Sequence, residues 1–230
     1  HYSMGGLWVD YDQMTEIPGL FAAGECDYSQ HGANRLGANS LLSAIYGGMV
    51  AGPNAVKYIK GLKKHAEDLP EEIFTRREKE EQEKWEAILK MDGTENAYLL
   101  HKELGEWMTD NMTVVRVNSK LEETYKKLTE LQERWENINI NDTQKWSNQG
   151  AHFTRQLKNM LYLAKVMTKG ALLRNESRGA HYKPEFPERD DENFLKTTMA
   201  KFDPATGEPI ITYQEVDVSL IPPRKRDYSK

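Results

Sequence analysis

A short stretch near the start of the chain combines residue types that can hold an anion. An apolar segment precedes Glu25, and residues 31–42 then read HGANRLGANSLL. Small residues let a backbone approach a ligand closely, and Arg35 offers a planar guanidinium that can bind a carboxylate with two hydrogen bonds. Asn39 or Ser40 is predicted to cap a helix whose first amides face the same space. The stretch therefore predicts a site at which a cofactor and an acidic substrate meet.

Four blocks of sequence carry a resemblance to a known family. They read HYSMGG at residues 1–6, GLFAAGEC at 19–26, HGANRLGANSLL at 31–42 and RNESRGAHY at 174–182. Together they resemble the flavoprotein subunits of succinate dehydrogenase and fumarate reductase, and L-aspartate oxidase is similar in the same blocks. The sequence of the closing residues 220–228 is similar to that of the corresponding segment in the respiratory enzymes of Gram-positive bacteria.

The resemblance implies an oxidoreductase that interconverts succinate and fumarate by hydride transfer to N5 of FAD. It assigns the binding of the two substrate carboxylates to His1 and Arg35. It also implies that Glu25 accepts a hydrogen bond from a ribityl hydroxyl of the flavin, and that Ser40 and Leu41 present backbone amides to the pyrimidine edge of the flavin. A helix N-terminus at that edge stabilises the negative charge that reduction places there.

Other residues receive supporting or structural interpretations. The resemblance implies that Arg178 and His181 brace active-site loops without touching substrate, and we expect no metal site at this histidine. The alternative for Arg35 is a surface ion pair with Glu25 or Asp27.

The resemblance also implies what the chain lacks. No glycine-rich dinucleotide fingerprint follows a strand in this sequence, and we expect that fingerprint, a flavin-attachment histidine and the proton-delivering arginine upstream of His1. The 230 residues are therefore expected to be the C-terminal part of a longer flavoprotein, with no catalytic residue of their own and no turnover alone. The implied partners are an iron-sulfur subunit and a membrane-anchor cytochrome b subunit with a quinone site, on the cytoplasmic face of the cell membrane.

Composition narrows the class of protein. The net charge of −5 argues against a general nucleic-acid binder. Charged residues make up 29% and the mean hydropathy is −0.76, so much of the chain is expected to be solvated surface. No run of 18 apolar residues is present, so we expect no membrane span. Cys26 is the only cysteine, which excludes an internal disulfide. We expect it to be a small buried residue and not a nucleophile, and we interpret His31 as a loop residue outside the substrate set.

The sequence predicts a mainly helical fold in three parts. Residues 1–60 are expected to be the C-terminal segment of an α/β FAD-binding domain, with short strands at Leu7–Val9 and Leu20–Ala23. Because these strands lack a sheet, we expect the segment alone to be poorly ordered or packed against a neighbouring copy. Residues 61–175 are expected to form an antiparallel bundle of three or four helices that resembles a spectrin repeat. Residues 176–230 are expected to form a tail with a β-hairpin.

Apolar stripes at helical spacing support the bundle. One stripe comprises Leu121, Tyr125, Leu128, Leu131 and Trp135. A second stripe comprises Leu100, Leu104, Trp107 or Met108, and Met112. A third comprises Phe153, Leu157, Met160 or Leu161, Ala164 and Met167. The helix that carries the stripe from Leu121 to Trp135 is expected to begin with a capping box of Ser119 and Glu122, or with Asn118 as its cap.

The predicted hairpin pairs 196–202 with 210–216 across a turn at 203–207. A non-catalytic helical interaction module, with the bundle docking a partner, is the alternative from outside the enzyme class.

Overall fold

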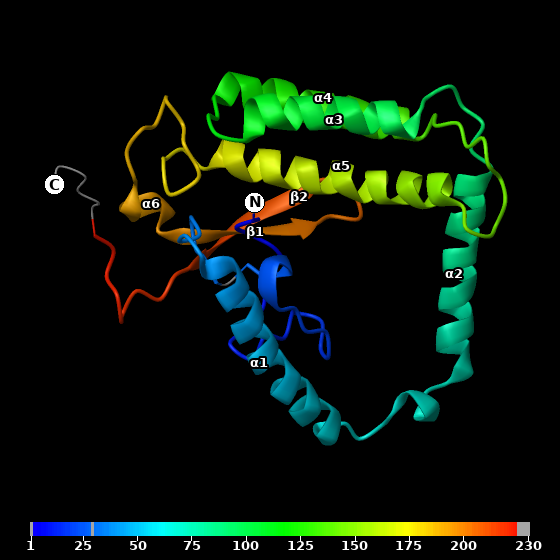
Figure 1. Cartoon of the computed structure of the whole chain (residues 1–230), viewed down its shortest axis with the longest axis horizontal. Helices are drawn as coiled ribbons and strands as arrows, with labels where there is room; N and C mark the ends of the chain where they lie inside the picture. The colour runs from blue at the N-terminus through cyan, green and yellow to red at the C-terminus, as the bar shows by residue number, and fades with distance from the viewer. Residues whose placement is uncertain (1, 29, 225–230) are drawn as a thin grey trace. The chain divides into compact units, whose positions relative to one another are not determined.

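The computed structural model describes residues 2–28 and 30–224 and forms two compact units, His1–Ile88 and Leu89–Lys230 (Figure 1). The fold is mainly helical with a small two-stranded antiparallel sheet, as predicted. The helices are η1 (Gly24–Cys26), α1 (Asn39–Gly61), η2 (Ala66–Asp68), α2 (Glu71–Leu89), α3 (Ala97–Met112), α4 (Asn118–Trp135), α5 (Gln149–Leu173) and α6 (Asp191–Phe194). The strands are β1 (Lys196–Phe202) and β2 (Pro209–Glu215).

In the first unit, α1 packs closely against the short helix η1. A Cβ added at Gly47 would lie 3.1 Å from the backbone nitrogen of Gly24 and 3.2 Å from the Cβ of Ala23. Glycine at this position therefore allows α1 to approach the turn that carries Glu25. The helix continues through Pro53 to Gly61 without interruption.

The two strands predicted in the first unit do not form, which corrects the expectation for Leu7–Val9 and Leu20–Ala23. Leu7 makes a single parallel bridge with Asp27, and Phe21 a single antiparallel bridge with Met14. A strand needs a neighbour along its whole length to satisfy its backbone groups. Here each bridge rests on two backbone hydrogen bonds, which is too short a pairing for a strand.

The second unit contains an antiparallel bundle of α3, α4 and α5 (Figure 1). Arg134 at the end of α4 donates from Nε to Glu95, just before α3, at 2.8 Å. Trp135 donates from its indole nitrogen to the carbonyl oxygen of Thr154, in the first turns of α5, at 2.8 Å. Each helix of the bundle therefore runs opposite to its neighbour in sequence.

The predicted stripes form the core of this bundle. The buried members, each less than 8% exposed, are Leu100, Leu104, Met112, Leu121, Leu128, Leu131, Trp135, Leu157, Leu161 and Ala164. Met167 is 55% exposed, so its assignment to the stripe was wrong. The buried residues Ala164, Thr168 and Ala171 define the inward face of α5 in this region, and Met167 lies beside that face.

The start of α4 corrects the capping prediction. Its N-cap residue is Val117, which makes no side-chain cap, and Asn118 and Ser119 lie inside the helix. The backbone N–H of Asn118 donates to both carboxylate oxygens of Glu185, at 3.1 and 3.0 Å. The cap is thus supplied by a residue 67 positions away, and a carboxylate at a helix N-terminus is electrostatically favourable.

The loop that precedes α3 pairs with the loop that follows α4. Asp92 bridges Asn139, and Glu95 bridges Ile138. A Cβ added at Gly93 would lie 2.0 Å from the carbonyl oxygen of Asn137, so this close approach requires glycine.

The C-terminal hairpin forms in the predicted place, with Lys196 opposite Glu215 and Phe202 opposite Pro209. It lies along α5 (Figure 1). Glu208 anchors it to the bundle, because its carboxylate accepts hydrogen bonds from Tyr125 of α4 and from Lys165 of α5, the latter at 2.6 Å. Burial alone raises the pKa of Glu208, but these two donors outweigh burial and lower it.

Candidate functional site

Residues 2–7 run beside the turn that carries Glu25. Leu7 donates its N–H to the carbonyl oxygen of Cys26 at 2.8 Å, and its own carbonyl accepts from Tyr28 at 3.2 Å. A Cβ added at Gly6 would lie 2.3 Å from the carbonyl oxygen of Cys26. Glycine at this position therefore brings the N-terminal segment onto residues 26–28.

Tyr2 and Ser3 connect the predicted site residues. The N–H of Ser3 donates to Oε1 of Glu25 at 2.8 Å. The hydroxyl of Tyr2 lies 3.1 Å from Oγ of Ser43, in the second turn of α1, and its ring lies 5.5 Å from the guanidinium carbon of Arg35. Two consecutive residues therefore link the predicted flavin ligand to the predicted substrate ligand.

Arg35 keeps most of its hydrogen-bonding capacity unused. Its Nη1 donates to the carbonyl oxygen of Leu36 at 3.0 Å, whereas its buried Nε has no hydrogen-bond partner among the described residues. Within residues 2–28 and 30–224 it makes no ion pair with Glu25 or Asp27, so that alternative does not describe the structure. The side of the guanidinium formed by Nε and Nη2 has the geometry that binds a carboxylate with two parallel hydrogen bonds.

The N-terminus of α1 corrects the predicted cap. The N-cap residue is Ala38, in the left-handed conformation with φ of 65°, and it provides no side-chain hydrogen bond to the first turn. Asn39 and Ser40 lie inside the helix, followed by Leu41. The first amides of a helix need partners from outside it, and together they attract negative charge. An anionic flavin edge fits this position, and the carboxylate of Glu25 fits a ribityl hydroxyl as an acceptor.

Two further predictions concern residues at this end of the chain. His1, the other predicted substrate ligand, lies outside the described residues. Cys26 was expected to be buried and is exposed, with its Sγ 3.4 Å from the carbonyl oxygen of Ala23. It ends the one-turn helix η1, and Gly24 is the buried residue of that turn.

In the second unit, Glu176 is the centre of a buried network of charges. Its side chain is fully buried and accepts from Nη1 of Arg174 at 2.5 Å. Arg178 donates to both of its oxygens, from Nε at 2.8 Å and Nη2 at 2.9 Å, and the N–H of Asp190 donates at 2.9 Å. One carboxylate thus compensates two guanidinium groups, as a buried charge requires.

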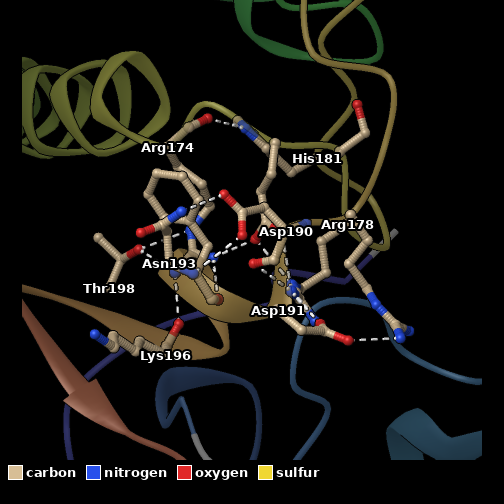
Figure 2. A network of polar contacts seen from close by, with 12 residues as sticks. Arg174, Arg178, His181, Asp190, Asp191, Asn193, Lys196 and Thr198 are labelled. Carbon is tan, nitrogen blue, oxygen red and sulfur yellow. Dashed lines mark hydrogen bonds and ion pairs between the residues drawn. The ribbon is translucent and has the colours of Figure 1, made fainter. Parts of the chain in front are cut away.

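The two arginines carry the network to neighbouring elements, as Figure 2 shows. Arg174 donates to the carbonyl oxygen of Lys196 at 2.5 Å and to Oγ1 of Thr198 at 3.1 Å, both on β1. Arg178 pairs with Asp191 at the start of α6, at 2.7 Å. Burial alone lowers the pKa of Arg178, but its carboxylate partners outweigh burial and raise it.

His181 is held as a neutral ring. Nη1 of Arg116 lies 2.6 Å from Nδ1, and a guanidinium can only donate, so Nδ1 accepts. Nε2 therefore carries the proton and donates to the carbonyl oxygen of Arg174 at 2.9 Å. Burial, together with the charges of Arg116, Lys183 and Arg174, lowers the pKa of His181 to about 4, although its bond to the Arg174 carbonyl acts in the opposite direction.

Lys183 is another cation of this region. It is fully buried, and its Nζ donates to Oδ1 of Asn118 at 2.6 Å, to the carbonyl oxygen of Leu172 at 3.0 Å and to Oδ1 of Asn175 at 3.0 Å. Burial lowers its pKa to about 8. The ammonium joins the end of α5 to the start of α4.

Comparison with known proteins places the chain in a family. Residues 101–228, more than half of the chain, match the model of the fumarate reductase flavoprotein C-terminal region. The chain belongs to this family. Residues 1–41, which include Arg35, match the model of an FAD binding domain.

The chain is similar to succinate dehydrogenase and fumarate reductase flavoprotein subunits. The succinate dehydrogenase flavoprotein subunit of Bacillus subtilis is 71% identical over all 230 residues, and the fumarate reductase flavoprotein subunit of Escherichia coli is 36% identical over 231 residues. The matches cover 100% and 99% of this chain but only 39% and 38% of the relatives.

Solved structures of the same family share the fold. A variant of E. coli quinol fumarate reductase FrdA superposes with a TM-score of 0.91 at 36% identity, covering 98% of this chain and 38% of that one. The apo form of the Mycobacterium smegmatis Sdh1 complex gives 0.80 at 31% identity, covering 97% and 37%.

Sequence reasoning selected Arg178 and His181 but missed the residues that hold them in place. Both lie in the second unit, in the network around Glu176, and their supporting role stays a prediction. The alternation of charge in Arg174-Asn175-Glu176-Ser177-Arg178 was a usable signal for Glu176. Arg116, 65 residues from His181, gave none.

Two further observations bear on ligands and membranes. In the part of the chain that the structure describes, no three histidine, cysteine or acidic side chains gather closely enough to hold a metal ion. None of the helices in that part has both the length and the apolarity needed to cross a lipid bilayer.

Proposed function

We propose that this chain acts in a flavin-dependent oxidoreductase that interconverts succinate and fumarate, and that Arg35 binds one carboxylate of the substrate. The observation that supports this most directly is the guanidinium of Arg35, which has no ion-pair partner in the described structure and a buried Nε without a hydrogen-bond partner. A buried donor without a partner costs free energy unless a ligand satisfies it.

The proposed roles follow from the groups that each residue presents. Arg35 donates from Nε and Nη2 to one carboxylate, which fixes the orientation of the substrate as well as its position. His1 binds the other carboxylate. A substrate held at both ends presents its central carbons to the flavin in one orientation.

The residues proposed to contact FAD are Glu25, Ser40 and Leu41. When bound, FAD accepts the hydride at N5. Glu25 accepts a hydrogen bond from a ribityl hydroxyl while it holds the N–H of Ser3. The amides of Ser40 and Leu41 point from the first turn of α1, where positive potential stabilises negative charge on the pyrimidine edge.

The proposal extends to partners and place of action. We propose that electrons pass from the flavin to an iron-sulfur subunit and then to quinone at a membrane-anchor cytochrome b subunit. The flavoprotein would then lie peripherally on the cytoplasmic face of the bacterial membrane. Structures in the family include a quinol-fumarate reductase with menaquinol molecules, which supports the quinone link. Co-purification of an iron-sulfur subunit would support this assembly.

The test uses a chimera in which this chain replaces the aligned part of the Bacillus subtilis subunit. We expect succinate oxidation in the chimera and none by the 230 residues alone. Arg35→Lys should lower kcat/KM by about 100-fold, because lysine cannot reproduce two parallel hydrogen bonds. Arg76→Lys, on the exposed surface of α2, is the matched control. Unchanged kcat/KM in Arg35→Lys contradicts the proposal, and oxidation of L-aspartate in place of succinate favours the oxidase.

A further inference from the structure

We propose that Tyr2 is a positioning residue for Arg35, and that its aromatic face holds the guanidinium with Nε and Nη2 turned toward the substrate carboxylate. The inference rests on the proposed function and adds to it a residue that does not itself bind substrate. The contact between the ring of Tyr2 and the guanidinium of Arg35 carries it.

The guanidinium carbon of Arg35 lies 5.5 Å from the ring centroid of Tyr2. This distance is within the range in which the negative face of an aromatic ring attracts a cation. Among the described residues Arg35 makes one hydrogen bond, from Nη1 to Leu36, and one bond does not by itself fix the plane of the group. The ring of Tyr2 supplies a further contact that restricts this plane.

The ring of Tyr2 is itself fixed in place by Ser43. The buried hydroxyl of Ser43 donates its one hydrogen to the carbonyl oxygen of Ser40 at 2.8 Å. Its oxygen can then only accept from Tyr2, at 3.1 Å, and from Nε2 of His31, at 3.0 Å. Tyr2 is consequently the donor of its own bond, and its hydroxyl is committed to α1.

His31 makes an edge-to-face contact with the same ring. The two ring centroids are 4.9 Å apart at an interplanar angle of 86°, the edge-to-face geometry that aromatic pairs favour. Tyr2 thus makes three contacts. Its hydroxyl bonds to Ser43, its ring makes an edge-to-face contact with His31, and its ring lies near the cationic guanidinium of Arg35. Arginine loses considerable side-chain freedom when it binds a ligand, and a contact that restricts it beforehand lowers that cost.

The experiment measures malonate binding to the Bacillus subtilis chimera through the change in flavin absorbance, together with kcat and KM for succinate. Tyr2→Leu removes the aromatic face, and we expect about tenfold weaker binding with KM raised more than kcat is lowered. Tyr2→Phe keeps the face and loses only the bond to Ser43, so binding should stay within about threefold. Tyr11→Leu, a substitution of a tyrosine that is 94% exposed, is the matched control and should bind like the unaltered chimera.

Each other outcome has an assigned meaning. Wild-type binding in Tyr2→Leu overturns the inference, and so does Tyr2→Phe binding as weakly as Tyr2→Leu, because the hydroxyl would then be responsible. Tyr2→Met is a second non-aromatic variant, and loss of flavin from both it and Tyr2→Leu also overturns the inference by assigning Tyr2 to the fold. If Arg35→Ala binds malonate normally, the proposed function fails; if only Tyr2→Leu binds normally, the positioning role alone fails.

Discussion

The two units differ in how much of their apolar surface they bury. In the second unit Leu121, Leu128 and Leu157 are fully buried, and Glu176 is surrounded by donors. In the first unit, α1 leaves apolar side chains exposed, Leu41 by 74%. Among the described residues each unit holds one buried side-chain donor without a partner, Nε of Arg35 in the first and Nε2 of Gln132 in the second. We therefore expect the second unit to be the more stable of the two, while a ligand role for the first unit stays a proposal.

The largest effect expected from breaking this contrast is at Glu176. Glu176→Gln removes the charge that compensates Arg174 and Arg178 while keeping the size of the side chain. Because two guanidinium groups would lose their buried counter-charge, we expect a loss of about 3–5 kcal/mol in the free energy of unfolding. Urea unfolding followed by circular dichroism measures it. Glu192→Gln, at an exposed position in α6, is the control, and equal effects of the two would refute the central role of Glu176.

The neutral ring of His181 predicts a pH dependence of the second unit. The pKa of His181 is lowered to about 4 in the folded chain, against 6.5 for the unfolded reference, so the unfolded chain takes up the proton first as pH falls. The stabilisation is complete above pH 6.5 and is lost as pH falls toward 4, by about 3 kcal/mol in total.

Unfolding free energies of the unaltered chain and of His181→Gln, measured at several pH values, isolate this contribution. Glutamine can still accept from Arg116 and donate to the carbonyl of Arg174, but it does not titrate. The difference between the two curves should be flat above pH 6.5 and change below it. A difference that stays flat down to pH 4 would contradict the assignment of a neutral, buried His181.

Substitution of two glycines by alanine tests the close packing of the second unit. Gly93→Ala places a methyl group 2.0 Å from the carbonyl oxygen of Asn137, so the paired loops must separate, at a cost of about 2 kcal/mol. Apart from its chain neighbours and the backbone of its own helix, a Cβ added at Gly105 in α3 has no described atom within 4 Å, so Gly105→Ala should stabilise the helix by about 1 kcal/mol. Thermal denaturation should therefore show opposite shifts, and shifts of the same sign would be inconsistent with this packing.

Hydrogen exchange sharpens the contrast without mutation. The amides of α5 lie on a closed core, whereas those of α1 lie on a helix with an exposed apolar face. We expect exchange in α1 to be at least about tenfold faster than in α5. Similar protection in both helices would show that the first unit is as stable as the second.

Periodic features of the fold were predictable from sequence, whereas features that depend on distant partners were not. The stripe from Leu121 to Trp135 and the hairpin after Lys196 follow from local spacing and turn residues. The cap of α4 by Glu185 and the single bridge of Leu7 depend on partners that no local pattern reveals.

The candidate site likewise has features that the sequence predicted and features that it did not. Glycines and the residue types of the Arg35 stretch indicated an anion site, and the sequence resemblance suggested its ligand. The contact of Arg35 with Tyr2 and the bond of Tyr2 to Ser43 span more than 30 residues, and composition and spacing gave no indication of either. The predicted helix cap at Asn39 or Ser40 failed because Ala38 adopts a left-handed conformation that the sequence did not suggest.

The most direct test of the account is a crystal structure of the chimera with malonate. The account predicts one carboxylate within about 2.7–2.9 Å of both Nε and Nη2 of Arg35, with the guanidinium still over the ring of Tyr2. Malonate bound elsewhere, with Nε of Arg35 still lacking a partner or turned to a protein carboxylate, would contradict it.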